Sequence, residues 1–175
     1  DCLLSRGLGD VYKRQEQMTE NGLLTEQGSS TFWDRSTLYA LRGIYIAGQA
    51  DRATEFLSHY ARRRLLGDHV PYPIEAWPEG SQRHLAAESG LFCRVITEGL
   101  FGIRPTGFRS FDLTPSMPSG WNRMALRHIR AFENNFDLVI EKQPDGFLRV
   151  TLAISGCNPR AFRLRQGASL RIKLP

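Results

Sequence analysis

Several residue types and patterns that mark whole classes of protein are scarce in this sequence. Its 175 residues include only 3 cysteines, too few to form a disulfide scaffold. No stretch supplies the roughly 18 to 20 consecutive apolar residues of a membrane-spanning helix, so we expect no membrane partner. Neither a glycine-rich phosphate loop nor a nucleophile elbow occurs, and the 4 histidines show no metal-ligand spacing with cysteines or carboxylates. The sequence therefore predicts neither a metal nor another cofactor.

What remains is an average globular composition with a basic excess. The apolar fraction is 41% and the charged fraction 23%, both close to globular averages. The formal net charge of +5 would suit a nucleic-acid partner if the basic residues were clustered. They are scattered instead, and the run Arg62-Arg63-Arg64 falls near a predicted helix end, where the helix dipole favours cations. We interpret this run as a solvated cluster and expect no nucleic-acid partner.

The first fifteen residues differ in character from the rest. Residues 5–15 read Ser-Arg-Gly-Leu-Gly-Asp-Val-Tyr-Lys-Arg-Gln and resemble a transposon-end sequencing adapter translated in frame. We therefore expect residues 1–15 to be a non-native leader, and we exclude them from fold reasoning. On this interpretation the chain is a truncated reading frame, and its partners include the missing N-terminal part of its own protein. The alternative is an ordinary amphipathic leader.

Helical periodicity dominates the first half of the remaining sequence. Apolar residues at three- and four-residue steps predict helices over 35–48, over about 51–65 and over 83–101. The short connection between the first two predicts antiparallel neighbours. Gly90 and Gly99 fall inside the third helix, where glycine is unfavourable, so we interpret them as sites of close helix packing.

From about Thr106 the apolar period changes to two, which is typical of strands. The alternation covers 108–113 and 136–140, and a turn at 143–146 leads into a strand over 147–154. Two more short strands are predicted, at 161–165 and 169–174. Five apolar side chains are expected inside this part: Phe136, Leu138, Ile140, Val150 and Leu152.

Helices followed by strands indicate an α+β protein with two parts. The sequence predicts a helical region over 16–104 and an antiparallel β domain over 105–175.

The loop between the second and third predicted helices contains many side chains that could carry chemistry. It runs from Asp68 to His84 and is too long and aromatic for a simple connection, which favours a functional loop. Glu75 and Glu79 flank Trp77. A carboxylate can act as a general acid or base, and an indole offers a flat apolar face on which a sugar ring stacks. The alternative is that Glu79 caps the following helix and Trp77 is packing.

A family resemblance bears on this choice. The stretch Pro-Glu-Gly-Ser-Gln-Arg-His-Leu-Ala-Ala-Glu-Ser-Gly-Leu-Phe-Cys-Arg-Val-Ile-Thr-Glu-Gly-Leu-Phe-Gly-Ile over 78–103, followed by Phe-Asp-Leu-Thr-Pro-Ser-Met-Pro-Ser-Gly-Trp over 111–121, resembles the end of a six-hairpin glycosidase. That superfamily includes glucoamylases, bacterial α-L-rhamnosidases and the maltose phosphorylase group. The resemblance implies the last helical hairpins of an (α/α)6 barrel followed by a C-terminal antiparallel β-sandwich-like domain.

The same resemblance implies a function and a set of site residues. The Pro78-Glu79 pair resembles the Pro-Glu that holds the general base of glucoamylases, although Gly80 stands where they have Gln. It implies a glycoside hydrolase with an inverting two-carboxylate mechanism, with Glu79 as general base and Glu75 as its alternative. Gln82 and His84 are assigned to substrate binding. The general acid is expected upstream, so the chain alone is expected to be inactive, and export to the periplasm or cell exterior is expected.

Residues before the first predicted helix complete the candidate set. Trp33 and Asp34 are predicted substrate contacts, with a hydrophobic staple and a helix N-cap as the alternatives. Glu88 follows His84 by four residues and is interpreted as part of a helix-surface pair rather than as a catalytic group.

Two further expectations follow from the sequence. An oligosaccharide or polysaccharide is the expected partner, and a noncatalytic sugar-binding module, with Trp33, Trp77 and Trp121 stacking on sugar, is the alternative. If barrel helices are missing, Leu38, Ala86, Phe92 and Val95 should lie near an exposed apolar surface.

Overall fold

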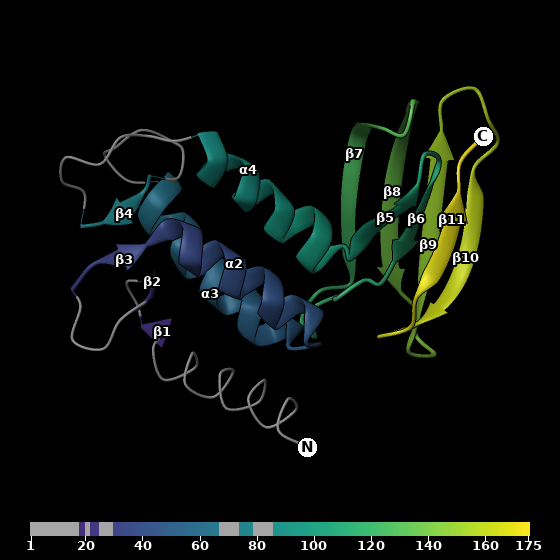
Figure 1. Cartoon of the computed structure of the whole chain (residues 1–175). Coiled ribbons are helices and arrows are strands. Elements are labelled where there is room, and N and C mark those ends of the chain that lie inside the picture. Colours follow the sequence, from purple (N-terminus) through teal and green to yellow (C-terminus); the bar gives the residue numbers. More distant parts are fainter. Residues whose placement is uncertain (1–17, 20–21, 25–29, 67–73, 79–85) are drawn as a thin grey trace, which may run out of the picture. The chain divides into compact units, whose positions relative to one another are not determined.

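The computed structural model of the chain divides into two compact units. The helical unit comprises Asp1–Ile44 and Arg52–Ile96, and the β unit comprises Tyr45–Asp51 and Thr97–Pro175. Figure 1 shows helices and antiparallel sheets together, in agreement with the α+β class. The structure describes residues 18–19, 22–24, 30–66, 74–78 and 86–175.

The three predicted helices are present within the described residues. They are α2 (Asp34–Ile46), α3 (Ala50–Leu65) and α4 (Ala86–Arg94), and the last continues as the π-helix η1 (Val95–Leu100). After α2 the chain reverses at Gly48, whose φ of 79° suits glycine and whose N–H donates to the Tyr45 carbonyl at 2.9 Å. The short connection makes α2 and α3 antiparallel, as predicted.

Apolar residues at helical spacing form the core of the helical unit. Leu38 and Val95 are both buried, so the expectation that they lie at an exposed apolar surface is wrong. Ala86 is exposed, and Phe92 stacks on Tyr60 with ring centroids 6.2 Å apart. The large apolar side chains exposed on the helices or just after them are Tyr39, Ile46 and Leu66.

Close packing does not explain the glycine at position 90. Among the described residues, no atom lies within 4 Å of a Cβ built on Gly90, so the close-packing interpretation of this residue is wrong for that part of the chain. Gly99 is buried, as that interpretation requires.

Two small antiparallel sheets in the helical unit were not predicted. One pairs β1 (Met18–Thr19) with β2 (Gly22–Leu23), and the other pairs β3 (Phe32–Trp33) with β4 (Ala76–Trp77). Strands of two residues are too short to show a period-2 pattern, so hydrophobic alternation could not reveal them. The β3–β4 pairing matters most, because it joins two segments that both contain predicted site residues.

The β unit consists of a four-stranded and a three-stranded antiparallel sheet. Their orders are β10-β9-β8-β7 and β11-β6-β5. The strands are β5 (Ile103–Gly107), β6 (Ser110–Leu113), β7 (Arg123–Ala131), β8 (Asn134–Lys142), β9 (Phe147–Ile154), β10 (Arg160–Arg165) and β11 (Leu170–Lys173).

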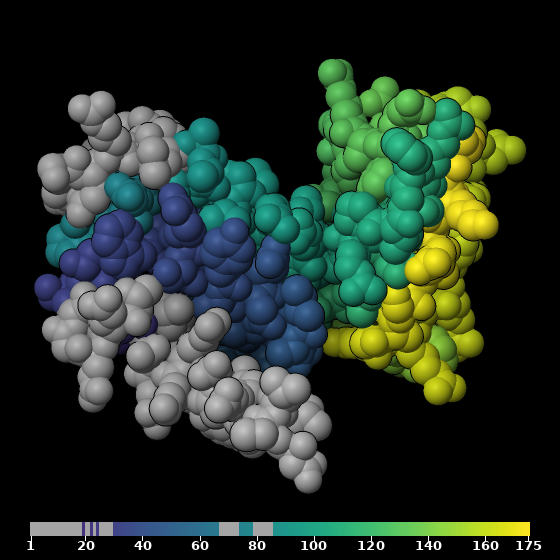
Figure 2. Space-filling view, viewed as in Figure 1, coloured from purple at the N-terminus to yellow at the C-terminus, as the bar shows by residue number. Residues whose placement is uncertain are grey.

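The apolar faces of these two sheets share one core. Phe111 of β6 stacks on Phe136 of β8 with ring centroids 5.9 Å apart. In the space-filling view the teal and green parts of this unit lie directly against each other (Figure 2). The five apolar residues predicted to lie inside the β domain are all buried, which confirms them. The predicted turn is also confirmed, since Gly146 has a φ of 79° and donates to the Gln143 carbonyl at 3.0 Å.

The sequence pattern was misleading in two places in the β unit. The alternation over 108–113 predicted one strand, but Phe108 lies in the turn between β5 and β6 and is 99% exposed. Strand β7 was missed because a bulge between Leu126 and Ile129 shifts its register and breaks the period of two.

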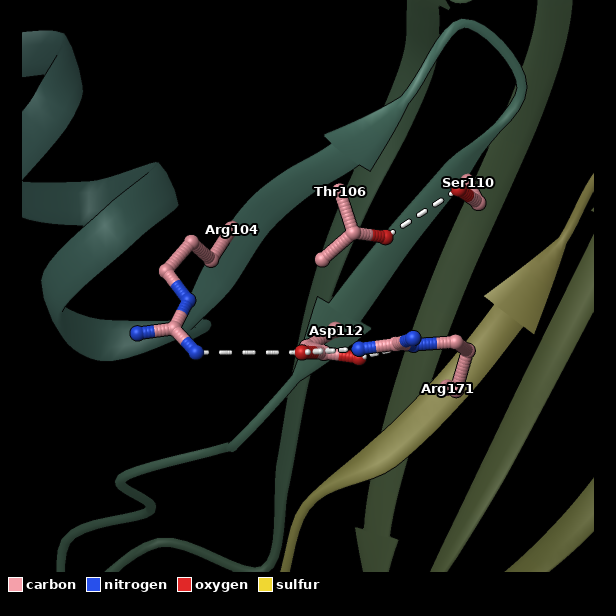
Figure 3. A network of polar contacts seen from close by, with 5 residues as sticks. All are labelled: Arg104, Thr106, Ser110, Asp112 and Arg171. Carbon is pink, nitrogen blue, oxygen red and sulfur yellow. Dashed lines mark hydrogen bonds and ion pairs between the residues drawn. The ribbon is translucent and has the colours of Figure 1, made fainter.

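Charged side chains of the β unit pair on its surface. Asp112 of β6 accepts hydrogen bonds from Arg171 of β11 at 2.7 and 3.0 Å and lies 3.8 Å from Arg104 of β5 (Figure 3). The hydrogen bonds from Arg171 are the main reason that the pKa of Asp112 lies below its usual range.

Candidate functional site

The β3–β4 pairing brings four predicted site residues together. Trp33 lies opposite Ala76, Phe32 lies opposite Trp77, and the Asp34 N–H donates to the Glu75 carbonyl at 3.0 Å. Trp33, Asp34, Glu75 and Trp77 therefore gather where α2 begins and the 68–84 loop passes. The sequence spacing alone did not predict this pairing.

The Asp34 carboxylate is enclosed by protein groups. It is 0% exposed, accepts from the Tyr60 hydroxyl at 3.0 Å and accepts from Arg64 Nε at 3.1 Å. Burial raises the pKa of Asp34 above its ordinary value, more than the neighbouring Arg64 lowers it. The pKa of Tyr60 is also raised, first by burial and then by the adjacent Asp34. A direct sugar contact by Asp34 would require one of these partners to be displaced.

Trp77 packs against arginine. The guanidinium carbon of Arg64 lies 4.6 Å from the centre of the Trp77 ring, and that of Arg63 lies 5.9 Å from it. Such cation–π contacts are favourable and fix the orientation of the indole. Trp33, in contrast, is 39% exposed. Of these two predicted stacking residues, Trp33 presents more of its surface for a ligand.

Arg64 was misinterpreted in the sequence. Its side chain is 1% exposed and paired with Asp34, so it does not belong to a solvated cluster. Arg62 is exposed, as that interpretation requires. Position on the helix distinguishes them, because Tyr60 and Arg64 are four residues apart and share the buried face of α3.

A second buried carboxylate lies beside this cluster. Glu88 of α4 is 0% exposed, and its Oε1 accepts from Arg35 Nε at 3.0 Å and from Arg35 Nη2 at 2.8 Å. The interpretation of Glu88 as a helix-surface residue is therefore wrong. The sequence analysis did not select Arg35. The one feature that could have pointed to it is its position directly after the candidate residue Asp34.

Three predicted site residues lie outside the described residues. They are Glu79, Gln82 and His84, so the assigned general base has no structural test here. Of the two candidate general bases, Glu75 lies within the described residues. It is half-buried, and its main chain is fixed by the hydrogen bond from Asp34.

The described part of the chain contains no group of three or more His, Cys, Asp or Glu residues arranged to hold a metal ion. Its two cysteines, Cys93 and Cys157, are both exposed. No helix among these residues is long and apolar enough to cross a membrane.

Comparison of the chain with protein-family models, with curated proteins and with solved structures finds no match.

Proposed function

We propose that this chain is part of a glycoside hydrolase and contributes one wall of its sugar-binding site. The observation that carries the proposal is the β3–β4 pairing, which sets the exposed Trp33 beside Glu75 and a buried polar cluster. An exposed indole with neighbouring hydrogen-bonding groups suits a sugar, which has both apolar faces and hydroxyl groups. The helices would then be the last hairpins of an (α/α)6 barrel, followed by a β-sandwich-like domain.

The proposed reaction is hydrolysis of a glycosidic bond with inversion. One carboxylate removes a proton from water as the water attacks the anomeric carbon, and a carboxylic acid protonates the departing oxygen. Glu79 is proposed as the base and Glu75 as its alternative. The general acid is assigned to no described residue.

The buried cluster gives this site a rigid support. Asp34, Tyr60 and Arg64 hold the start of α2 against the end of α3. The Asp34 N–H holds the main chain at Glu75 by a further hydrogen bond. Precise support of this kind is what a catalytic carboxylate requires, because small displacements reduce rates strongly.

The test uses the longest protein that the source gene encodes. Purified protein is incubated with a panel of aryl glycosides, and the anomer released first is identified by proton NMR. We expect hydrolysis with inversion, and we expect Glu79→Gln to lower kcat by about 100-fold or more. Glu75→Gln is measured in parallel, and Glu55→Gln on the exposed surface of α3 is the matched control.

The outcomes separate the assignments. If Glu75→Gln gives the large loss and Glu79→Gln does not, the base is Glu75. If both leave kcat within tenfold, neither carboxylate is the base.

A noncatalytic sugar-binding module is the second candidate. It is favoured by Trp121, an indole of the β unit that is 39% exposed, as Trp33 is. Sugar binding without hydrolysis by the longer protein would support this candidate.

A further inference from the structure

Next to the proposed sugar site, Arg35 is an exposed residue bound to a buried one. Its side chain is 50% exposed, yet its guanidinium group pairs with the Glu88 carboxylate, which is 0% exposed. We propose that Arg35, positioned by Glu88, binds a pair of adjacent hydroxyl groups on a neutral sugar that stacks on Trp33. This inference rests on the proposed function and assigns both a new binding residue and the charge class of its ligand.

The contact between Glu88 and Arg35 fixes the plane of the guanidinium group. Both hydrogen bonds end on the same oxygen, Oε1, at 3.0 Å from Nε and 2.8 Å from Nη2. The other oxygen, Oε2, is buried and has no hydrogen-bond partner in the described part of the chain. An unsatisfied buried carboxylate oxygen is unfavourable for folding. Glu88 thus holds the guanidinium plane of Arg35 through one oxygen while its other oxygen stays unsatisfied among the described residues.

The outer edge of Arg35 remains available for a ligand. An arginine carries N–H donors on three nitrogens in one rigid plane, and Glu88 occupies donors on only two of them. One remaining donor on Nη1 and one on Nη2 are parallel and can bind two neighbouring oxygen atoms at once. Adjacent hydroxyl groups of a pyranose provide such a pair of oxygens.

Trp33 and Arg35 are close along the chain. The two residues flank the buried Asp34, and both are exposed. Because only one residue separates them, the proposal is that a sugar ring stacked on the Trp33 indole presents hydroxyl groups at its rim to the Arg35 guanidinium. Stacking combined with planar hydrogen bonding is a common way for proteins to bind neutral polar ligands.

The surrounding charges favour a neutral ligand over an acidic one. Among the described residues, Glu88 compensates the charge of Arg35, Asp34 compensates that of Arg64, and Glu75 adds a negative charge near Arg35. A uronate carboxylate at Arg35 would meet the negative charges of Glu88 and Glu75, whereas a hydroxyl pair would not. The preference for neutral sugar thus depends on Glu88.

The experiment measures the affinity of the 175-residue chain for matched glycosides by isothermal titration calorimetry. The probes are the methyl glycosides of glucose, galactose, mannose and rhamnose, with methyl glucuronide and methyl galacturonide as acidic counterparts. We expect at least one neutral glycoside to bind more tightly than either uronide. Arg35→Ala should weaken that binding about tenfold or more, because hydrogen bonds from charged donors are among the stronger ones. Arg62→Ala, an exposed arginine of α3, should change it less than about twofold.

Two variants distinguish positioning from general damage. Glu88→Gln keeps the shape but removes the compensating charge, so it should weaken neutral binding and shift the preference toward the uronides. Arg35→Lys keeps the charge but loses the planar pair of donors, so it should also lose about tenfold. Circular dichroism checks folding, and Arg35→Lys keeps the test valid if Glu88→Gln does not fold.

Three results would overturn the inference. If the Arg35→Ala variant binds the neutral glycoside with an affinity within twofold of the parent, Arg35 is not part of the site. Equal weakening of neutral and acidic binding by Glu88→Gln, in a folded variant, would make Glu88 merely structural. Binding of no glycoside at all overturns the inference, and hydrolysis by the longer protein would then show that the proposed function survives without it.

Discussion

The two units of this protein differ in where their charged side chains lie. The helical unit buries Asp34, Arg64 and Glu88 almost completely, whereas the buried side chains described in the β unit are apolar. Ion pairs of the β unit lie at its surface, as in Arg163–Asp145 and Arg109–Glu133. Burying paired charges adds little stability compared with apolar residues of similar size. The buried charges of the helical unit are therefore better explained by the site proposed there than by stability.

Arg64→Leu should produce the largest effect and tests this contrast directly. It leaves the Asp34 carboxylate buried without its cation, so we expect the helical unit to lose about 3 to 5 kcal/mol of stability. Hydrogen exchange of backbone amides measures the loss separately for α2, α3 and the β strands. The double variant Asp34→Leu with Arg64→Leu should recover part of it.

The matched control for this variant is Arg163→Leu in the β unit, where the partner Asp145 is exposed. Exposed pairs contribute about 0 to 1 kcal/mol, so the change should be small. Similar losses for Arg64→Leu and Arg163→Leu would remove the contrast between the units.

Gly102→Ala should have the next largest effect, in the β unit. Gly102 has a φ of 65°, and an added Cβ would overlap the backbone carbonyl of Thr114. We expect a loss of about 2 kcal/mol or more, seen as a lower denaturation midpoint of β-strand circular dichroism. Gly146→Ala is the control, since Gly146 has a φ of 79° but open space around it, and it should lose only about 1 kcal/mol. Equal losses would show that the contact with Thr114 is unimportant.

Gly90→Ala should stabilise the helical unit. No atom of the described residues lies within 4 Å of a Cβ at this position in α4, so no clash with them opposes the gain in helix propensity. We expect about 1 kcal/mol, measured as increased amide protection in α4. Gly43→Ala in α2 has equally open space and should behave alike. A loss of stability in either variant would contradict the open packing seen around these glycines.

The smallest expected effect is a difference in how the units respond to acid. The pKa of Asp34 is raised by burial, so its contribution to stability increases as the pH falls through that raised value toward 3.8. The pKa of Asp112 is lowered, first by Arg171, and that of Asp145 is lowered, first by the Phe147 N–H. Their contributions are therefore lost as the pH falls below 3.8. Hydrogen exchange between pH 3 and pH 6 should show opposite trends, which Asp34→Asn removes from the helical unit. Parallel trends in both units would contradict these directions.

Much of the fold could be predicted from the sequence, because long elements repeat their pattern several times. Helices α2 and α3 and strands β8 and β9 each repeat it over at least two turns or four alternations. Strands β3 and β4 are too short for any pattern, and β7 contains a bulge that breaks its own. Local patterns therefore missed the pairing that assembles the proposed site.

The site was predicted less completely than the fold. Aromatic and acidic residue types drew attention to Trp33, Asp34, Glu75 and Trp77, which the structure brings together. Arg64 was mistaken for a solvated residue, since a sequence does not show which charge finds a buried partner. Arg35 was missed for the same reason, because Glu88 lies far from it along the chain.

The most direct test of the account uses the chain's 3 tryptophans as reporters. Their indole N–H signals in a nitrogen-15 correlation spectrum are assigned from single Trp→Phe variants and followed as the tightest-binding neutral glycoside is added. We predict a saturable shift of the Trp33 signal, a smaller shift for Trp77, and no shift for Trp121 of the β unit. A shift of Trp121 alone, or no shift of Trp33 at saturating glycoside, would contradict a sugar site at the start of α2.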